Sequence, residues 1–207
     1  MFNKPFTKSK RFDGIIGFHR LDDFWISCTP SEQDALTSYC RRALNAQPDS
    51  SPIKGKVASP NGALTWFTTN ISWAASEHNY LFADKLIAYG SKQRGIHREI
   101  HFFYNAVYEC YYRQRDLNAG AIGKAKEYCK KDMELFHAHK DEFRDPITGA
   151  MPSMPSFKQY AIICEKQGEF QEAIDICRLA LSYGLDDGTK GGYEGRIKKL
   201  ENKLAKA

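Results

Sequence analysis

The segment at residues 154–187 constrains the fold most, because small, aromatic and charged residues recur there at helical offsets. Two stretches with apolar residues three and four positions apart flank Gly168, as in a pair of amphipathic helices. Gly168 can adopt the left-handed conformation that ends the first helix, and Ala161 and Ala173 are small where the helices would approach most closely. The segment predicts an antiparallel helix hairpin, with Phe170 filling the space between its helices.

The residues that define this pattern are Phe157, Tyr160, Ala161 and Cys164 in the first helix, then Ala173, Cys177 and Ala180 in the second. With Gly168 and Phe170 between them, residues 154–187 resemble a tetratricopeptide repeat, a helix–turn–helix unit of about 34 residues. One repeat cannot bury its own apolar face, so neighbouring repeats are expected. Looser matches occupy 64–97 and 101–139; the second has a longer turn and Asp132 where a small residue is usual. The resemblance, over roughly 64–206, implies an all-α fold: a right-handed superhelix of antiparallel helix hairpins, that is, a TPR-like α-solenoid.

The end of the chain fits a C-terminal capping helix over 192–206. Tyr193, Ile197, Leu200 and Leu204 form a narrow apolar stripe, and lysines cover most of the remaining surface. The repeat domain is therefore expected over 61–207. It contains one shorter loop over 140–153, where Pro and Gly interrupt the helical pattern.

The first 60 residues form an N-terminal extension outside the resemblance. Thr29 as N-cap and Glu32 as the partner of a capping box predict a helix over about 30–46. The apolar residues of 14–28 have helical spacing, but two glycines there count against a helix. A Pro- and Ser-rich loop over 45–63 closes the extension.

The composition is that of a globular chain, with 42% hydrophobic and 27% charged residues and a net charge of +5. No apolar run approaches the roughly 18 residues of a membrane span, and no secretory signal follows the basic start, so no membrane partner is expected. Six cysteines without a C-x-x-C pair favour a cytoplasmic protein with reduced thiols. Cys164 and Cys177 are expected to face each other inside the hairpin, unbonded.

The histidines are the main candidates for site chemistry. His97 and His101 have the i, i+4 spacing of a metal-binding pair, but no third ligand lies near them in the sequence, so a solvated or packed pair is favoured. His137 and His139 are expected to interact with the dipole of a helix C-terminus. No nucleophile, base and orienting group occur together, so we expect neither an enzyme nor a metal or other cofactor.

The resemblance implies a scaffold that binds a protein or peptide in the concave groove lined by first helices. A nucleic-acid-binding protein, or a regulatory subunit of a separately encoded enzyme, remains the alternative. Groove positions in the first repeat fall on Thr65, Thr68, Thr69 and Ser72. The residues expected to contact the partner are Asn105, Glu109, Tyr112, Arg113, Lys158, Gln159, Ile162, Glu165 and Lys166.

Overall fold

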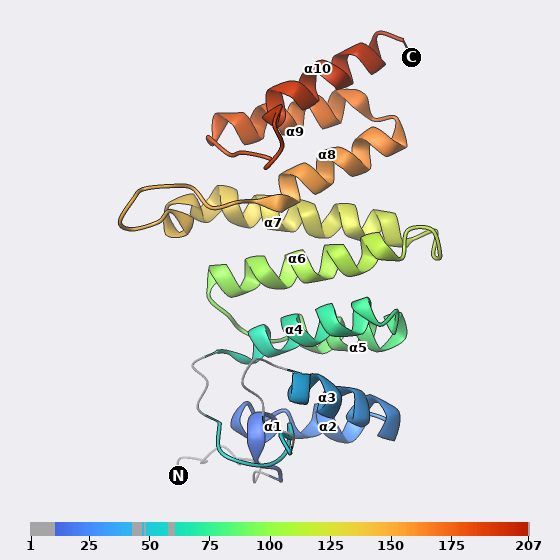
Figure 1. Ribbon diagram of the computed structural model, residues 1–207, viewed down its shortest axis with the longest axis vertical. Helices are drawn as coiled ribbons and strands as arrows, with labels where there is room; N and C mark the ends of the chain where they lie inside the picture. The colour runs from blue at the N-terminus through green and yellow to red at the C-terminus, as the bar shows by residue number, and fades with distance from the viewer. Residues whose placement is uncertain (1–10, 43–46, 48, 58–60, 207) are drawn as a thin grey trace, which may run out of the picture. The chain divides into compact units, whose positions relative to one another are not determined.

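The computed structural model describes residues 11–42, 47, 49–57 and 61–206. Every regular element in these ranges is an α-helix, so the expected all-α class is confirmed (Figure 1). The chain divides into two compact units, Met1–Arg94 and Gly95–Ala207. Among the described residues, no helix is long and apolar enough to cross a membrane.

The first unit contains both the N-terminal extension and the segment expected to form the first repeat. Its helices are α1 (Gly14–Phe18), α2 (Asp22–Ser27), α3 (Pro30–Arg42), α4 (Ala63–Ser76) and α5 (Tyr80–Gly90). The expected domain boundary lies near residue 60, whereas the compact units divide after Arg94.

The sequence left undecided whether residues 14–28 form a helix. In the structure they contain two short helices. Gly14 has φ +58°, and a Cβ there would lie 2.5 Å from the carbonyl oxygen of Pro52. The backbone N–H of Ile16 donates to that same oxygen at 3.0 Å. Arg20, with φ 57°, then separates α1 from α2. The close approach of the 52–55 loop therefore requires a glycine at position 14, and the positive φ of Arg20 prevents one continuous helix.

The capping box at the start of α3 is confirmed. The backbone N–H of Thr29 donates to Glu32 Oε2 at 2.7 Å, and the Glu32 N–H donates to Thr29 Oγ1 at 3.3 Å. Residues 43–46, expected to continue this helix, lie outside the described residues. Glu32 also pairs with Lys85 of α5 at 2.7 Å, and Tyr39 donates to Glu77 at 2.8 Å. These bonds attach the N-terminal extension to the α4–α5 pair.

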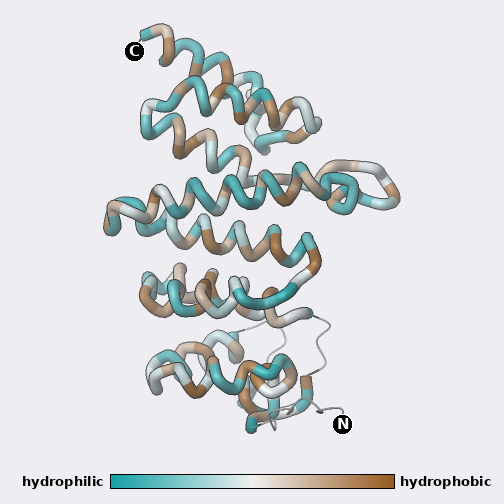
Figure 2. The backbone as a smooth tube through the Cα atoms, turned by 180° about the vertical axis from the view of Figure 1, so that it is seen from behind, coloured by the Kyte–Doolittle hydropathy of each residue, from teal (hydrophilic) through white to brown (hydrophobic). Residues whose placement is uncertain are grey.

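The second unit is a series of helices in which each packs against the next in the chain. They are α6 (His97–Arg113), α7 (Ala121–Phe143), α8 (Pro155–Gln167), α9 (Phe170–Ser182) and α10 (Gly192–Leu204). Apolar and polar residues alternate along them (Figure 2). This is the pattern of helices that bury one side and expose the other.

The α8–α9 hairpin is formed as expected. Gly168 has φ +77° and ψ 7°, the left-handed conformation that ends α8. The backbone N–H of Glu169 then donates to the carbonyl oxygen of Cys164 at 2.9 Å. Ala161 and Ala173 have no exposed surface, as close helix contact requires. Cys164 and Cys177 are buried free thiols.

The expected loop over 140–153 begins later than the sequence indicates, since α7 continues to Phe143. The Phe143 ring is buried and lies 5.7 Å from the rings of both His101 and Phe136. That apolar contact carries the helix past His139, where the backbone departs from helical geometry with φ −130° and ψ 23°. The end of α7 is thus set by tertiary packing and by a local kink.

We expect Gly168→Val to destabilise the protein by about 1–3 kcal/mol, because a β-branched residue is strained at positive φ. No atom beyond the neighbouring residues lies within 4 Å of the position that a Cβ would occupy, so the expected cost comes from the backbone conformation. Denaturant unfolding measures the effect. Gly168→Asn is the control, since Asn tolerates this conformation; an equal loss from both variants would contradict the explanation.

Leu200→Ala should destabilise the protein by about 2–5 kcal/mol, because its side chain is fully buried. Leu204→Ala, one turn further along α10, removes a side chain that is 42% exposed and should change stability by less than about 1 kcal/mol. Thermal melting compares the two variants. Similar melting temperatures would show that α10 does not cover an apolar surface.

Candidate functional site

The residues expected to contact a partner lie on two helices of the second unit, α6 and α8. All of them retain solvent exposure, although both helices bury apolar residues elsewhere on their surfaces. Glu109, Arg113 and Lys166 are the most exposed of the set, and the others are half-buried. Most of the expected set is therefore accessible to a ligand, although Asn105 Oδ1 and Gln159 Nε2 are buried.

Tyr112 is the centre of a cationic cluster that joins α6 to α8. The Lys166 ammonium lies 5.4 Å from the centroid of the Tyr112 ring, and the Arg115 guanidinium lies 4.5 Å from it. Arg115 also donates to the Tyr112 carbonyl oxygen at 2.9 Å. Contacts of this kind are electrostatic attractions between a cation and the face of an aromatic ring. Tyr112 and Lys166 were expected at the site, and Arg115 was not among the expected contact residues.

Two other expected contact residues on α8 are engaged within the chain. Glu165 pairs with Lys203 of α10 at 2.8 Å and lies 3.9 Å from Arg196. The Lys158 ammonium donates to the Asp187 carbonyl oxygen at 2.9 Å. The negative charge of Glu165 is thus balanced by α10, whereas the Lys158 side chain bonds to an uncharged carbonyl group.

Asn105 belongs to a buried polar network that sequence reasoning missed. His101 Nδ1 lies 2.7 Å from Asp132 Oδ1, and the Asn105 amide nitrogen lies 2.9 Å from His101 Nε2. Asp132 is fully buried and His101 is 5% exposed. The network explains why an acid occupies a helix position where a small residue is usual: its carboxylate has a histidine partner on the facing helix.

This network has the composition of a catalytic dyad but not its accessibility. Asp132 orients the imidazole through Nδ1, and Asn105 covers Nε2, the nitrogen that would act on a substrate. Asn105 Oδ1 and Asp132 Oδ2 are buried without a hydrogen-bond partner. The arrangement links α6 to α7. It also gives His101 partners other than His97, the residue with which His101 was considered as a metal-binding pair.

Replacing one member of the buried pair leaves the other uncompensated. His101→Leu should therefore destabilise the protein by about 3–5 kcal/mol. The double variant His101→Leu with Asp132→Leu should regain part of that loss, because no buried carboxylate remains. Urea unfolding of both single variants and of the double variant measures the coupling, and strictly additive losses would show that the pair does not act together.

A surface hollow lies between α7 and α9 and was not expected from the sequence. It is lined by the apolar side chains of Met133, Ile176 and Leu179 and by charged residues that include Lys130 and Glu134. Leu179 is 41% exposed. The sequence carries a signal for this hollow: Ile176 and Leu179 are apolar residues of α9 that are not among those defining the hairpin.

In the first unit, α4 borders a cleft with the N-terminal extension. Thr65 and Thr69, both expected groove residues, line it together with Ile15 of α1 and Cys40 of α3. The Thr69 hydroxyl donates to the Thr65 carbonyl oxygen at 3.1 Å. The N-terminal extension thus lines one side of the cleft in which the groove of the first repeat was expected.

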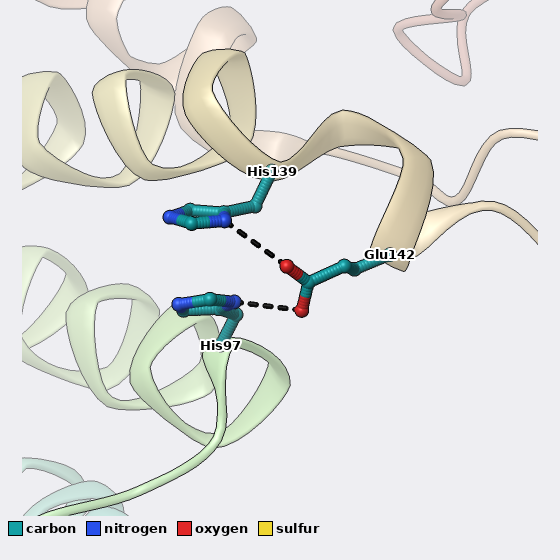
Figure 3. A group of neighbouring side chains, drawn as sticks. All are labelled: His97, His139 and Glu142. Atoms are coloured by element: carbon teal, nitrogen blue, oxygen red, sulfur yellow. Dashed lines mark hydrogen bonds and ion pairs between the residues drawn. The ribbon is translucent and has the colours of Figure 1, made fainter.

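Two histidines and a glutamate meet where α6 begins and α7 ends (Figure 3). His97 Nδ1 lies 2.7 Å from Glu142 Oε2, and His139 Nδ1 lies 3.0 Å from Glu142 Oε1. The two imidazole rings stack with centroids 3.6 Å apart. The hydrogen bond from His97, together with that from His139, lowers the pKa of the Glu142 carboxyl below its usual value. His139 was expected at a helix C-terminus, and it does lie near the end of α7.

One further group of potential metal ligands among the described residues is Cys164 with Glu169 and Glu172. Lys126 already occupies this position, with its ammonium 2.5 Å from Glu169 and 2.9 Å from Glu172. Burial raises the pKa of the Cys164 thiol to about 12. A protonated thiol and two carboxylates paired with a lysine do not offer a metal site.

No family model matches the chain, and no solved structure matches it. A protein of Aquifex aeolicus (strain VF5), described as an uncharacterized protein, is 29% identical over 121 residues. That match covers 58% of this chain and 57% of the relative. The chain thus spans little more than half the length of this relative, whose description names no function.

Proposed function

We propose that the second unit is a TPR-like solenoid that binds an extended segment of a partner protein along α6 and α8. Polar contacts between next-but-one helices support the solenoid: Tyr112 with Lys166 joins α6 to α8, and Glu165 with Lys203 joins α8 to α10. Lys126 with Glu169 joins α7 to α9 in the same way. In a stack of hairpins, like helices of successive repeats adjoin, and these contacts follow that pattern.

The cationic cluster at Tyr112 is the observation that carries the binding proposal. Arg115 and Lys166 flank the ring, and Arg113 is exposed beside it on α6. Tyrosine and arginine dominate the energetics of protein interfaces. Arg115 also pairs with the exposed Asp116 at 3.3 Å. Since Glu165 is neutralised by α10, Lys166 and Arg113 still favour a partner segment that carries a carboxylate at this point.

A binding role without catalysis is part of the proposal. The buried His101–Asp132 pair is closed by Asn105 and holds two helices together. We also propose a cytoplasmic setting, which the six free cysteine thiols support. Nucleic-acid binding remains the alternative, because Tyr112 and its cations would also suit a stacked base and a phosphate.

Selection of extended acidic peptides on the full chain, followed by fluorescence anisotropy, tests the proposal. Tyr112→Ala and Lys166→Glu should each weaken the selected peptide at least tenfold, about 1.4 kcal/mol. Neither side chain is buried, so each variant should unfold within about 0.5 kcal/mol of the wild type.

Lys198→Glu is the matched control, since it makes the same charge change on an exposed position of α10. Its affinity should stay within about twofold of the wild type if the effect of Lys166→Glu is local. Equal losses in the control and in Lys166→Glu would indicate a general charge effect. Tight single-stranded nucleic-acid binding with a steep salt dependence, in the absence of peptide binding, would favour the alternative.

A further inference from the structure

We propose that His97, His139 and Glu142 form a binding site for a divalent transition metal such as zinc. The three side chains come from two helices, and the two stacked imidazoles each reach a different oxygen of the Glu142 carboxylate (Figure 3). Their ligand atoms all lie within 4.8 Å of one another. This site is independent of the α6–α8 surface proposed for a partner.

The distances among the ligand atoms are close to those of a metal centre. In a tetrahedral zinc site, bonds of about 2.0–2.2 Å place neighbouring ligand atoms about 3.3–3.5 Å apart. Here the two Nδ1 atoms lie 2.7 and 3.0 Å from oxygens of the shared carboxylate. Because the ring planes are only 25° apart, one imidazole must also turn out of the stack so that both Nδ1 lone pairs meet at one ion, while the carboxylate withdraws by about half an ångström.

The ligand set selects the class of metal. Imidazole nitrogen suits zinc, copper, nickel and iron, and a single carboxylate with two histidines suits zinc well. Calcium and magnesium need more oxygen ligands than this cluster offers. The His97, His139 and Glu142 side chains are 32%, 35% and 58% exposed. Water can therefore fill the remaining coordination position.

The backbone brings these residues together in a way that simple helical spacing would not. His139 stands at the one non-helical position inside α7, and Glu142 follows it by three residues. His97 is the first residue of α6. A bound ion would join the beginning of α6 to the end of α7, opposite the end of the hairpin where their connecting turn lies.

The rival arrangement is a purely hydrogen-bonded trio, in which both Nδ1–H groups donate to Glu142 and no ion binds. Titration of the chelator-treated full-length protein with Zn²⁺, in competition with a chromophoric chelator, distinguishes the two. The wild type should bind one equivalent at this site. His139→Ala and the isosteric Glu142→Gln should each lower the association constant at least roughly 100-fold, since even outer-sphere partners contribute 10- to 100-fold.

Two control variants distinguish zinc binding at this site from binding by other side chains. His137→Ala removes an exposed histidine two residues from His139, and Glu169→Gln removes a carboxylate of the second group of potential ligands. Both should bind Zn²⁺ as the wild type does. Zinc should also raise the melting temperature of the wild type and of both controls, but not that of His139→Ala.

Co²⁺ provides a second readout, because its visible absorption reports the ligands directly. An absorption band typical of nitrogen and oxygen ligands, abolished in Glu142→Gln, would support the site. Wild-type protein that fails to bind Zn²⁺ would overturn the proposal. So would undiminished binding by His139→Ala and Glu142→Gln, or a thiolate charge-transfer band with Co²⁺.

Discussion

Apolar helix faces that only a neighbouring helix can cover determine the structure of the second unit. The α8–α9 hairpin buries Ala161 and Ala173 at its own contact, yet each helix retains further apolar surface. On the carboxyl side, α10 packs on α9 and buries Tyr193 and Leu200. Because the hydrophobic effect scales with the area removed from water, no hairpin of this kind is stable without its neighbours.

Polar interactions act on this apolar framework in two different ways. Ion pairs between helices, such as Lys203 with Glu165, are partly exposed, and pairs of this kind contribute about 0–1 kcal/mol each. They influence which helices adjoin more than they stabilise the fold. The His101–Asp132 pair is different, because both partners are buried and each depends on the other. We expect it to specify the register of α6 against α7, which apolar contacts alone define less sharply.

Local chemistry made much of the fold predictable from the sequence. Gly168 ends α8 and Thr29 caps α3 for reasons that lie within a few residues, so both were predicted correctly. The extension of α7 through His139 was not, because it depends on the distant contact between Phe143 and His101. The same holds for the site residues: His97 and His139 meet only through the pairing of α6 with α7, and their spacing in the sequence gives no sign of it.

The central functional claim is that a partner segment lies along α6 and α8. Nuclear magnetic resonance of the isotopically labelled full chain, titrated with an acidic peptide selected for binding, tests it most directly. Backbone amide shifts should be concentrated in residues 105–113 and 158–166, around the cationic cluster at Tyr112. Shifts confined instead to the hollow between α7 and α9, around Ile176 and Leu179, would contradict it.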